Sequence, residues 1–368
     1  MNALLTDIRE LIVSARKAVV HSVDLIQVVT NFDIGRRIVE HEQQGAERAK
    51  YGKQSIQELA KQLTGEFGKG FSERNLRSMR KFYLLYSDRF PEEYRTSSGG
   101  LTINASLLRI WQMPSAKSSH PFTLSWSQYV FLTSIANGEE RSFYEIEAAE
   151  NSWTLPELRR QFDSGLYVRL ALSRDKQELL RLSLEGQIVS RPEDLLKEPY
   201  ILEFLGLEEK SKYSETELES AIIDNLEHFL LELGKGFLFE ARQKRFTFDE
   251  DHFFVDLVFY NRLLRCYVLI DLKIGKLTHQ NLGQMQMYVN YFDRFVKLAD
   301  ERPTIGLILC RKKHDALVEI TLPSDANIHA KEYQLYLPDK EQLREKLVQW
   351  SEDAERLIDI LSKDSADT

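Results

Sequence analysis

Two apolar, strand-like runs between Val255 and Gly275 each contain one aspartate, Asp256 in the first and Asp271 in the second. Lys273 follows two residues after the second aspartate. Burying a charged group costs free energy unless the group is paired, hydrogen-bonded or bound to a metal. The connection between the runs, NRLLR, is short enough to predict antiparallel neighbouring strands. Any fold of this chain must therefore place two carboxylates in an apolar sheet and compensate their charge.

Side chains alternate between the two faces of a sheet, so Asp271 and Lys273 are expected on one face and Leu272 on the other. Asp256 in the neighbouring strand can approach the same site, where two negative charges would repel each other. A divalent cation such as Mg²⁺, which prefers oxygen ligands, would remove that repulsion. The ammonium group of Lys273 could then orient or deprotonate a water nucleophile and offset charge that builds on a phosphate.

The same residues also allow a purely structural interpretation. In it, Asp271 and Lys273 form an ion pair at a strand end, and Asp256 caps a turn. An acid-x-Lys triplet arises by chance in a chain with 57 acidic residues, and Glu208-Glu209-Lys210 in a polar segment is such a case. The surrounding sequence must therefore decide between the two interpretations.

Amphipathic helical spacing dominates the first half of the chain and begins with Leu4, Leu5, Ile8, Leu11 and Ile12. Residues 96–121 are rich in Gly, Ser and Pro, which predicts a loop or a break between helical parts, and helical spacing resumes at Leu124. In the second half, one amphipathic helix is expected at 218–233, followed by three strands, a helix and a further strand. This α-β-β-β-α-β order predicts a mixed sheet flanked by helices, and an α+β chain with two domains overall.

The predicted elements divide the chain into four segments. We expect a helical N-terminal domain at residues 1–180, a connecting segment at 181–213, an α/β domain with the carboxylates at 214–345, and a closing helix with a tail at 346–368. The formal net charge is -8, so the surface as a whole does not favour nucleic acid. Binding to nucleic acid would need a local basic face.

The N-terminal sequence carries Asp7, Arg9 and Glu10 at short intervals. It therefore lacks the uncharged stretch of a signal peptide and the roughly 18 apolar residues of a membrane span. The chain has two cysteines, Cys266 and Cys310, and both lie in apolar runs, where buried free thiols are expected rather than a disulfide. These features predict a cytoplasmic protein that does not contact a membrane.

The carboxylates belong to a longer ordered set. Glu219 lies in the predicted leading helix, Asp256 in a strand, Asp271-x-Lys273 in the next strand, and Gln284 in the helix that follows. This order resembles the core of the PD-(D/E)xK nuclease superfamily. More narrowly, FLLELGKGFLFEARQ, VDLVFYNR, DLKIGKL and GQMQMY resemble the bacterial YhcG-like nuclease family, whose N-terminal helical domain is matched here by FSERNLRSMRKFY, LSWSQYVFL and ERSFYEIEAAENSW.

The resemblance implies a restriction-endonuclease-like α/β domain that hydrolyses phosphodiester bonds with Mg²⁺ or Mn²⁺. It also implies a role for each matching residue: metal ligation by Asp256 and Asp271, catalysis by Lys273, a supporting carboxylate at Glu219 and an orienting amide at Gln284. The implied partner is nucleic acid, with DNA favoured, and a homodimer would suit double-strand cleavage.

Two positions depart from the usual pattern of the family. Asp271 stands where glutamate is common, and Val255 stands where a proline often precedes the first aspartate. Gln286 competes with Gln284 for the helix position, and Glu219 could instead act on the dipole of its own helix. The chain therefore has a second interpretation, as a nucleic-acid-binding or complex-organising subunit whose nuclease fold is catalytically idle.

The segment FGKGFSERNLRSMRKFYLLY predicts a helix that follows a turn at Gly68 and Gly70 and is capped by Ser72. At 100° per residue, the basic face of this helix holds Arg74, Arg77, Ser78 and Lys81, and the apolar face holds Leu76, Met79, Phe82, Tyr83 and Tyr86. With the preceding helix SIQELAKQLTGEF, this layout is typical of a helix-turn-helix unit whose second helix contacts DNA. The alternative is a charged face that meets only solvent.

Overall fold

The computed structural model describes residues 24–43, 51–89, 122–172, 176–207, 213–248, 250–313, 315–323, 326–339, 341–342 and 345. The chain divides into two compact units, Met1–Leu158 and Arg159–Thr368, and the division falls within α8 (Leu155–Asp163). The helix expected at the N-terminus, the loop expected at 96–121 and the closing helix and tail expected at 346–368 lie outside the described residues. The domain boundaries expected from the sequence stay predictions.

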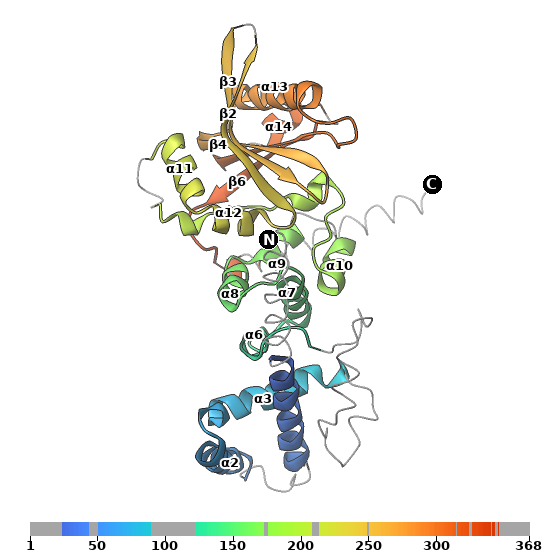
Figure 1. Cartoon of the computed structure of the whole chain (residues 1–368), viewed down its shortest axis with the longest axis vertical. Coiled ribbons are helices and arrows are strands. Elements are labelled where there is room, and N and C mark those ends of the chain that lie inside the picture. Colours follow the sequence, from blue (N-terminus) through green and yellow to red (C-terminus); the bar gives the residue numbers. More distant parts are fainter. Residues whose placement is uncertain are drawn as a thin grey trace, which may run out of the picture. The chain divides into compact units, whose positions relative to one another are not determined.

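Helices make up the described part of the first unit (Figure 1). They are a helix over residues 24–43, α2 (Tyr51–Phe67), η1 (Lys69–Phe71), α3 (Glu73–Tyr86), η2 (Ser87–Arg89), α6 (Trp126–Leu132) and α7 (Gly138–Glu150). The core of the unit is aromatic. The ring of Phe82 is fully buried, and its centroid lies 4.9 to 5.8 Å from those of Phe32, Phe122, Trp126 and Tyr129. Offset and edge-on packing of this kind stabilises a core beyond the area that it buries.

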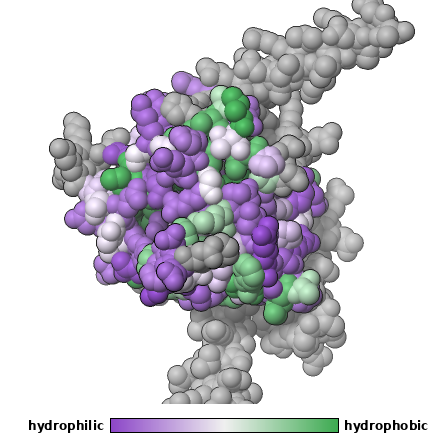
Figure 2. All heavy atoms as spheres, turned by 90° about the horizontal axis from the view of Figure 1, so that it is seen from above, coloured by the Kyte–Doolittle hydropathy of each residue, from purple (hydrophilic) through white to green (hydrophobic). Residues whose placement is uncertain are grey.

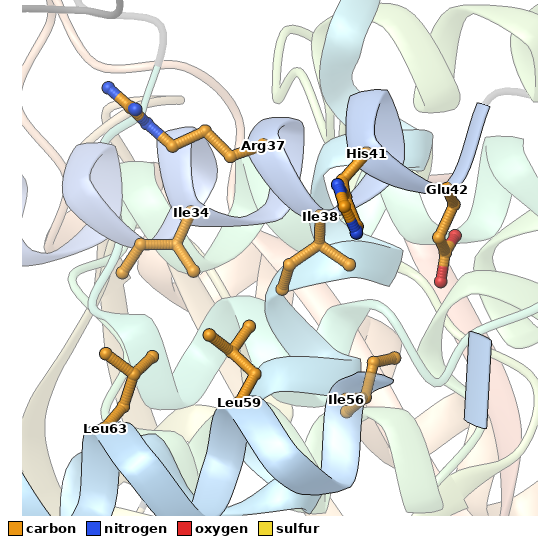
Figure 3. A pocket seen from close by; sticks show the side chains of 8 residues that line it. All are labelled: Ile34, Arg37, Ile38, His41, Glu42, Ile56, Leu59 and Leu63. Atoms are coloured by element: carbon orange, nitrogen blue, oxygen red, sulfur yellow. The ribbon is translucent and has the colours of Figure 1, made fainter. Parts of the chain in front are cut away.

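A pocket of about 410 Å³ lies between the helix over residues 24–43 and α2 (Figure 3). Ile34 and Ile38 on the first helix point towards Leu59 and Leu63 on the second. Arg37 points away from these apolar side chains. The facing apolar side chains are those that the amphipathic spacing of this region predicts, but of these four only Ile38 is buried, and the others are partly exposed in the pocket.

The second unit contains a mixed sheet of six strands in the order β1-β6-β5-β4-β3-β2. The strands are β1 (Tyr200–Ile201), β2 (Phe237–Phe248), β3 (Asp251–Asn261), β4 (Cys266–Lys276), β5 (Ile305–Lys312) and β6 (Ile328–Gln334). β2, β3 and β4 pair antiparallel, whereas β4, β5, β6 and β1 pair parallel. The mixed sheet expected from the sequence is confirmed, and so is the antiparallel pairing of β3 with β4.

Helices cover both faces of this sheet (Figure 1). On one face, α11 (Glu215–Asp224) and α12 (Leu226–Leu233) pack on alternate residues of the strands, including Leu257, Ile270 and Leu272. On the other face, α13 (His279–Phe295) and α14 (Asp315–Thr321) pack on the intervening residues, including Val258 and Leu269. The described part of the unit also contains the end of α8, α9 (Leu166–Leu172), α10 (Lys176–Glu185), η3 (Pro192–Leu195) and η4 (Glu203–Leu205).

Some elements differ from those expected. The single helix expected at 218–233 is two helices, α11 and α12, which separate at Asn225. The side chain of Asn225 donates to the carbonyl of Ala221 at 3.0 Å, and such a local bond competes with helix continuation. β1 and β6 were not expected. β1 has two residues, too few to show the alternation of side chains by which a strand is recognised in a sequence. It forms only because β6 provides its hydrogen-bonding partner.

Both cysteines lie in the sheet, Cys266 in β4 and Cys310 in β5. They are free and buried, as the apolar context predicts. Burial raises the pKa of each thiol to about 11, so neither is a thiolate at neutral pH. Both act as small core residues.

The face of the molecule shown in Figure 2 is mostly hydrophilic, and its apolar residues form small separate groups. In the described part of the chain, no helix combines the length and the apolar character that crossing a membrane requires.

Candidate active site

β4 contains both Asp271 and Lys273, and the strand becomes more exposed towards its C-terminal end. Ile270 and Leu272 pack towards α11 and α12, whereas Leu269 packs towards α13. Alternation therefore places Asp271 on the α13 face, with only 3% of its surface exposed. Lys273 follows where the strand becomes more exposed, and its Nζ lies 2.9 Å from Oδ2 of Asp271. The aspartate is thus buried while the lysine reaches it from the rim.

Asp256 lies where β3 and β4 separate. Their ladder ends at the pair of Leu257 and Ile270, one position before Asp256 and Asp271 would pair. Beyond that pair, Oδ2 of Asp256 accepts a hydrogen bond from the main-chain N–H of Leu272 at 2.9 Å. The side chain of Asp256 thus takes the place of a main-chain carbonyl as the acceptor for β4. Asp256 therefore lies in the same part of the sheet as Asp271.

Glu219 reaches this region from α11. It is nearly fully buried, and it accepts hydrogen bonds from Arg242 and from Gln243, both at 2.5 Å. The amide of Gln243 also donates to Oδ1 of Asp256 at 3.1 Å. One amide group therefore links the carboxylates of Glu219 and Asp256.

Gln243 has a backbone conformation that is rare for a residue with a side chain. Its φ is 46°, in the left-handed region. The residues on either side of Gln243 pair with those on either side of Asp256, so the two face each other across β2 and β3. Such a conformation costs on the order of 1–3 kcal/mol and clusters at functional sites. The sequence did not indicate Gln243. The pairing of β2 with β3 is irregular, and the alternation of side chains along a strand does not predict such an irregularity.

Gln284 projects from α13, and its amide donates to the hydroxyl of Tyr288 at 2.5 Å. Burial, together with the charge of Asp271, raises the pKa of Tyr288 to about 12. Gln284 thus binds a hydroxyl group that lies within the electrostatic reach of Asp271. Gln286, the alternative, donates to Asn290 on the same helix. Tyr288 was not expected, although its spacing of four residues from Gln284 places the two on one helix face.

The charges at the site do not balance. Burial and the charge of Asp256 raise the pKa of Asp271 to about 7, although Lys273 acts in the opposite direction. Burial alone would lower the pKa of Lys273, but Asp271 and Glu215 outweigh it and raise that pKa. Oδ2 of Asp271 is buried and lies 2.9 Å from Nζ of Lys273, but it has no hydrogen-bond partner of good geometry in the described part of the chain. The site therefore has an excess of negative charge.

Glu215 is another residue that the sequence did not indicate. It lies in the first turn of α11, and its Oε2 is 3.3 Å from Nζ of Lys273. Glu215 precedes Glu219 by four residues, so one face of α11 brings both acids towards the sheet. This spacing could have suggested Glu215 from the sequence.

We predict that Asp271→Asn stabilises the protein when divalent metals are chelated. The raised pKa of Asp271 means that the folded state is favoured by protonation, so stability falls as pH rises from about 4 towards about 7. Asparagine carries no charge and therefore removes this loss. We expect Asp271→Asn to raise the free energy of unfolding by on the order of 1–4 kcal/mol at pH 8 and by less at pH 5. Thermal unfolding in EDTA at both pH values measures it. A loss of stability at both would instead support the structural ion pair with Lys273.

The three basic residues expected on α3, Arg74, Arg77 and Lys81, are all exposed. The opposite face buries Leu76, Met79, Phe82 and Tyr86, and the hydroxyl of Ser72 accepts from the N–H of Asn75 at 3.3 Å to cap the helix. An open hollow of about 610 Å³ on this face is lined by Ser72, Glu73, Arg74, Arg77, Ser78 and Lys81. Glu73 lies 2.6 Å from Arg77 and neutralises part of its charge. The basic face is therefore exposed and concave.

Comparison with known proteins locates both halves of the chain. A family model described as the YhcG PDDEXK nuclease domain matches residues 193–348, and one described as the DUF1016 N-terminal domain matches residues 7–169. Over 348 residues, the chain is 41% identical to the protein named "Putative nuclease YhcG" from Escherichia coli (strain K12), covering 92% of this chain and 91% of the relative. The chain belongs to the YhcG family.

Membership of the YhcG family confirms the resemblance seen in the sequence. The PDDEXK match contains Glu219, Asp256, Asp271, Lys273 and Gln284, and the N-terminal match contains the basic face of α3. The crystal structure of a repair endonuclease from Pyrococcus abyssi aligns with 36% of this chain and 50% of its own chain, at 17% identity and a TM-score of 0.23. A likeness at that level says nothing about the site.

Proposed function

We propose that this YhcG-family protein hydrolyses phosphodiester bonds of nucleic acid, with DNA as the substrate, in a reaction that depends on Mg²⁺ or Mn²⁺. One observation carries the proposal. Asp256 and Asp271 meet where β3 and β4 separate, and the ammonium group of Lys273 lies beside them. Two carboxylates and a lysine at a partly exposed strand end suit metal-assisted attack of water on a phosphate.

The residues present fit a hard divalent cation. The buried oxygen of Asp271 without a hydrogen-bond partner and the repulsion from Asp256 both favour a positive charge at this point. Within the described residues, no three His, Cys, Asp or Glu side chains converge as a metal site. Two carboxylates completed by water and substrate phosphate are the usual ligands of Mg²⁺. When bound, such an ion supplies Lewis-acid polarisation of the phosphate.

The other side chains of the site hold these groups in place. Lys273 places a positive charge where negative charge builds on the phosphate during hydrolysis. Gln243 fixes the orientation of Asp256 and joins it to Glu219, which Arg242 holds from the other side. Gln284 orients the hydroxyl of Tyr288. Asp256 and Asp271 are proposed as metal ligands, with Lys273 as the catalytic cation.

A catalytically idle subunit is the competing proposal, and the ion pair of Asp271 with Lys273 is its structural support. The two proposals differ in how many carboxylates they require beside Lys273. A structural pair needs one carboxylate for one ammonium, whereas this site holds Asp256 and Glu215 as well. The excess of carboxylates favours the enzyme.

Metal dependence tests the proposal directly. Purified protein is expected to cleave at least one of duplex DNA, single-stranded DNA, branched DNA or RNA with Mg²⁺ or Mn²⁺, and EDTA should remove the activity because oxygen ligands alone hold the ion. Activity should return with excess Mg²⁺ but not with Zn²⁺. Cleavage that persists in fully chelated protein contradicts the mechanism. Binding of nucleic acid without cleavage of any substrate supports the idle subunit.

The exposed cations in the hollow on α3 support a second proposal, that the N-terminal unit contacts DNA phosphates. Changing Arg74, Arg77 and Lys81 together to Glu should weaken binding for many sequences alike and lower the slope of log affinity against log salt by about three. Fluorescence anisotropy across a salt series measures both. Circular dichroism provides the folding control. Unchanged affinity and slope in a folded variant would show that this face meets only solvent or another protein.

A further inference from the structure

We infer that Lys276 of β4 and Lys312 of β5 form a phosphate-binding pair that holds the nucleic-acid backbone a short distance from the cleavage site. This inference rests on the proposed function and extends it to the path of the substrate. It begins from the register of the two parallel strands. Three successive pairs on one face of the sheet are Asp271 with Ile308, Lys273 with Cys310, and Lys276 with Lys312.

A bulge keeps Lys276 on the same face as Lys273. β4 has three steps between these residues, whereas β5 has two between their partners. Without the extra residue, alternation would turn Lys276 to the opposite face. Ile308 and Cys310 both pack towards α13, so Lys312 lies on that face as well. The lysine pair therefore continues the line of Asp271 and Lys273 outwards, about 13 Å along β5 from the level of Asp271.

The two lysines repel each other. Paired strands lie about 4.8 Å apart, and like charges directly opposite each other in a sheet are destabilising. Both side chains are exposed, and neither has an ion pair within the described residues. Other lysines nearby do have partners, since Lys313 and Lys331 both contact Glu198, at 3.0 and 3.1 Å. The described residues place no carboxylate against either lysine of this pair, which favours the binding of an anion there.

The start of α13 adds to the positive potential beside the pair. The helix begins at His279, three residues after Lys276, and its first turn has no acidic residue. Its 17 residues give a full helix dipole, whose positive end favours phosphate. The loop between them is tied to β5, because the N–H of Leu277 donates to the carbonyl of Lys312 at 3.0 Å. Two exposed lysines in register and a helix N-terminus three residues further on thus lie together at one end of the sheet, where they suit a ligand with diffuse negative charge, such as a nucleic-acid backbone.

The test is the double variant Lys276→Gln, Lys312→Gln, with binding to a labelled duplex and a labelled single strand measured in EDTA across a salt series. Loss of two phosphate contacts should lower the salt slope by about two, which corresponds to affinity up to about 100-fold weaker at 0.1 M salt. The matched control is Arg262→Gln, Arg294→Gln. It makes the same charge change in the turn between β3 and β4, beyond the other end of β4, and in the last turn of α13, and it should bind as the wild type does.

Stability provides a second readout. Removing two repelling charges should leave the unfolding temperature in low salt equal to or above that of the wild type, whereas lysines with a structural role would lower it. A folded double variant that keeps wild-type affinity and slope overturns the inference. Cleavage by the wild type in that case leaves the proposed function standing. A wild type that neither binds nor cleaves any nucleic acid overturns both.

Discussion

Replacing Lys273 with alanine is expected to slow cleavage by at least about 10²- to 10³-fold while leaving the fold and nucleic-acid binding largely intact. Loss of a single preorganised positive group at a developing negative charge has an effect of this order. The side chain is 15% exposed and lies where β4 becomes more exposed, outside the apolar core of the sheet. Single-turnover cleavage with saturating enzyme measures the chemical step without the contribution of binding.

Two further variants sharpen this result. Lys273→Arg keeps the charge but changes the position of the donors, so we expect activity between those of the wild type and Lys273→Ala. Lys61→Ala, at an exposed site in α2, makes the same change elsewhere and should cleave at the wild-type rate. Wild-type cleavage by a folded Lys273→Ala protein would remove Lys273 from the mechanism and restore the interpretation as a structural ion pair.

The second large effect concerns stability and lies away from the site. Glu232 on α12 is fully buried, and its carboxylate accepts from Arg169 at 2.6 Å, from Arg160 at 2.7 Å and from the N–H of Ile201 at 3.0 Å. Arg169 is buried as well. Glu232→Ala would leave that guanidinium without its carboxylate, and we expect a loss of about 3–5 kcal/mol in the free energy of unfolding. Urea denaturation followed by circular dichroism measures the loss.

A surface pair provides the control for Glu232. Arg265 and Asp300 also form an ion pair, but both side chains are more than half exposed, and Asp300→Ala should cost no more than about 1 kcal/mol. The two arginines and Lys197 outweigh the effect of burial and lower the pKa of Glu232 to about 2. Its stabilisation is therefore complete above about pH 4.5 and is lost as pH falls towards 2. A gap between wild type and Glu232→Gln that does not narrow over this range would contradict this account.

The sequence predicts the parts of the site that depend on local periodicity. Alternation places Asp271 and Lys273 on one face, and the short connection after Asn261 pairs β3 with β4. Gln243 could not be predicted, because its position depends on the irregular pairing of β2 with β3 and on a left-handed backbone conformation. The alternation of side chains along a strand indicates neither of these. Long-range ion pairs could not be predicted either. Glu232 lies in an ordinary amphipathic helix, and Arg160 precedes it by 72 residues.

The ion pairs of Glu232 extend beyond the region that matches the nuclease-domain model. The PDDEXK match begins at residue 193, whereas Arg160 and Arg169 precede it. Their guanidinium groups nevertheless hold the carboxylate of α12, which packs on the face of the sheet below the site. Similarity thus identifies the domain to which the strands belong, and the buried ion pairs show which preceding helices hold α12 in place.

The pairing of β1 with β6 has a consequence for how the protein is made. β1 pairs through Tyr200 and Ile201 with a strand that ends at Gln334, so the sheet joins segments that leave the ribosome far apart in time. Contacts between distant segments also form slowly, because closing a long loop costs entropy before any contact rewards it. Asp256, Asp271 and Lys273 are therefore synthesised well before β6, the strand that joins β1 to the rest of the sheet around them.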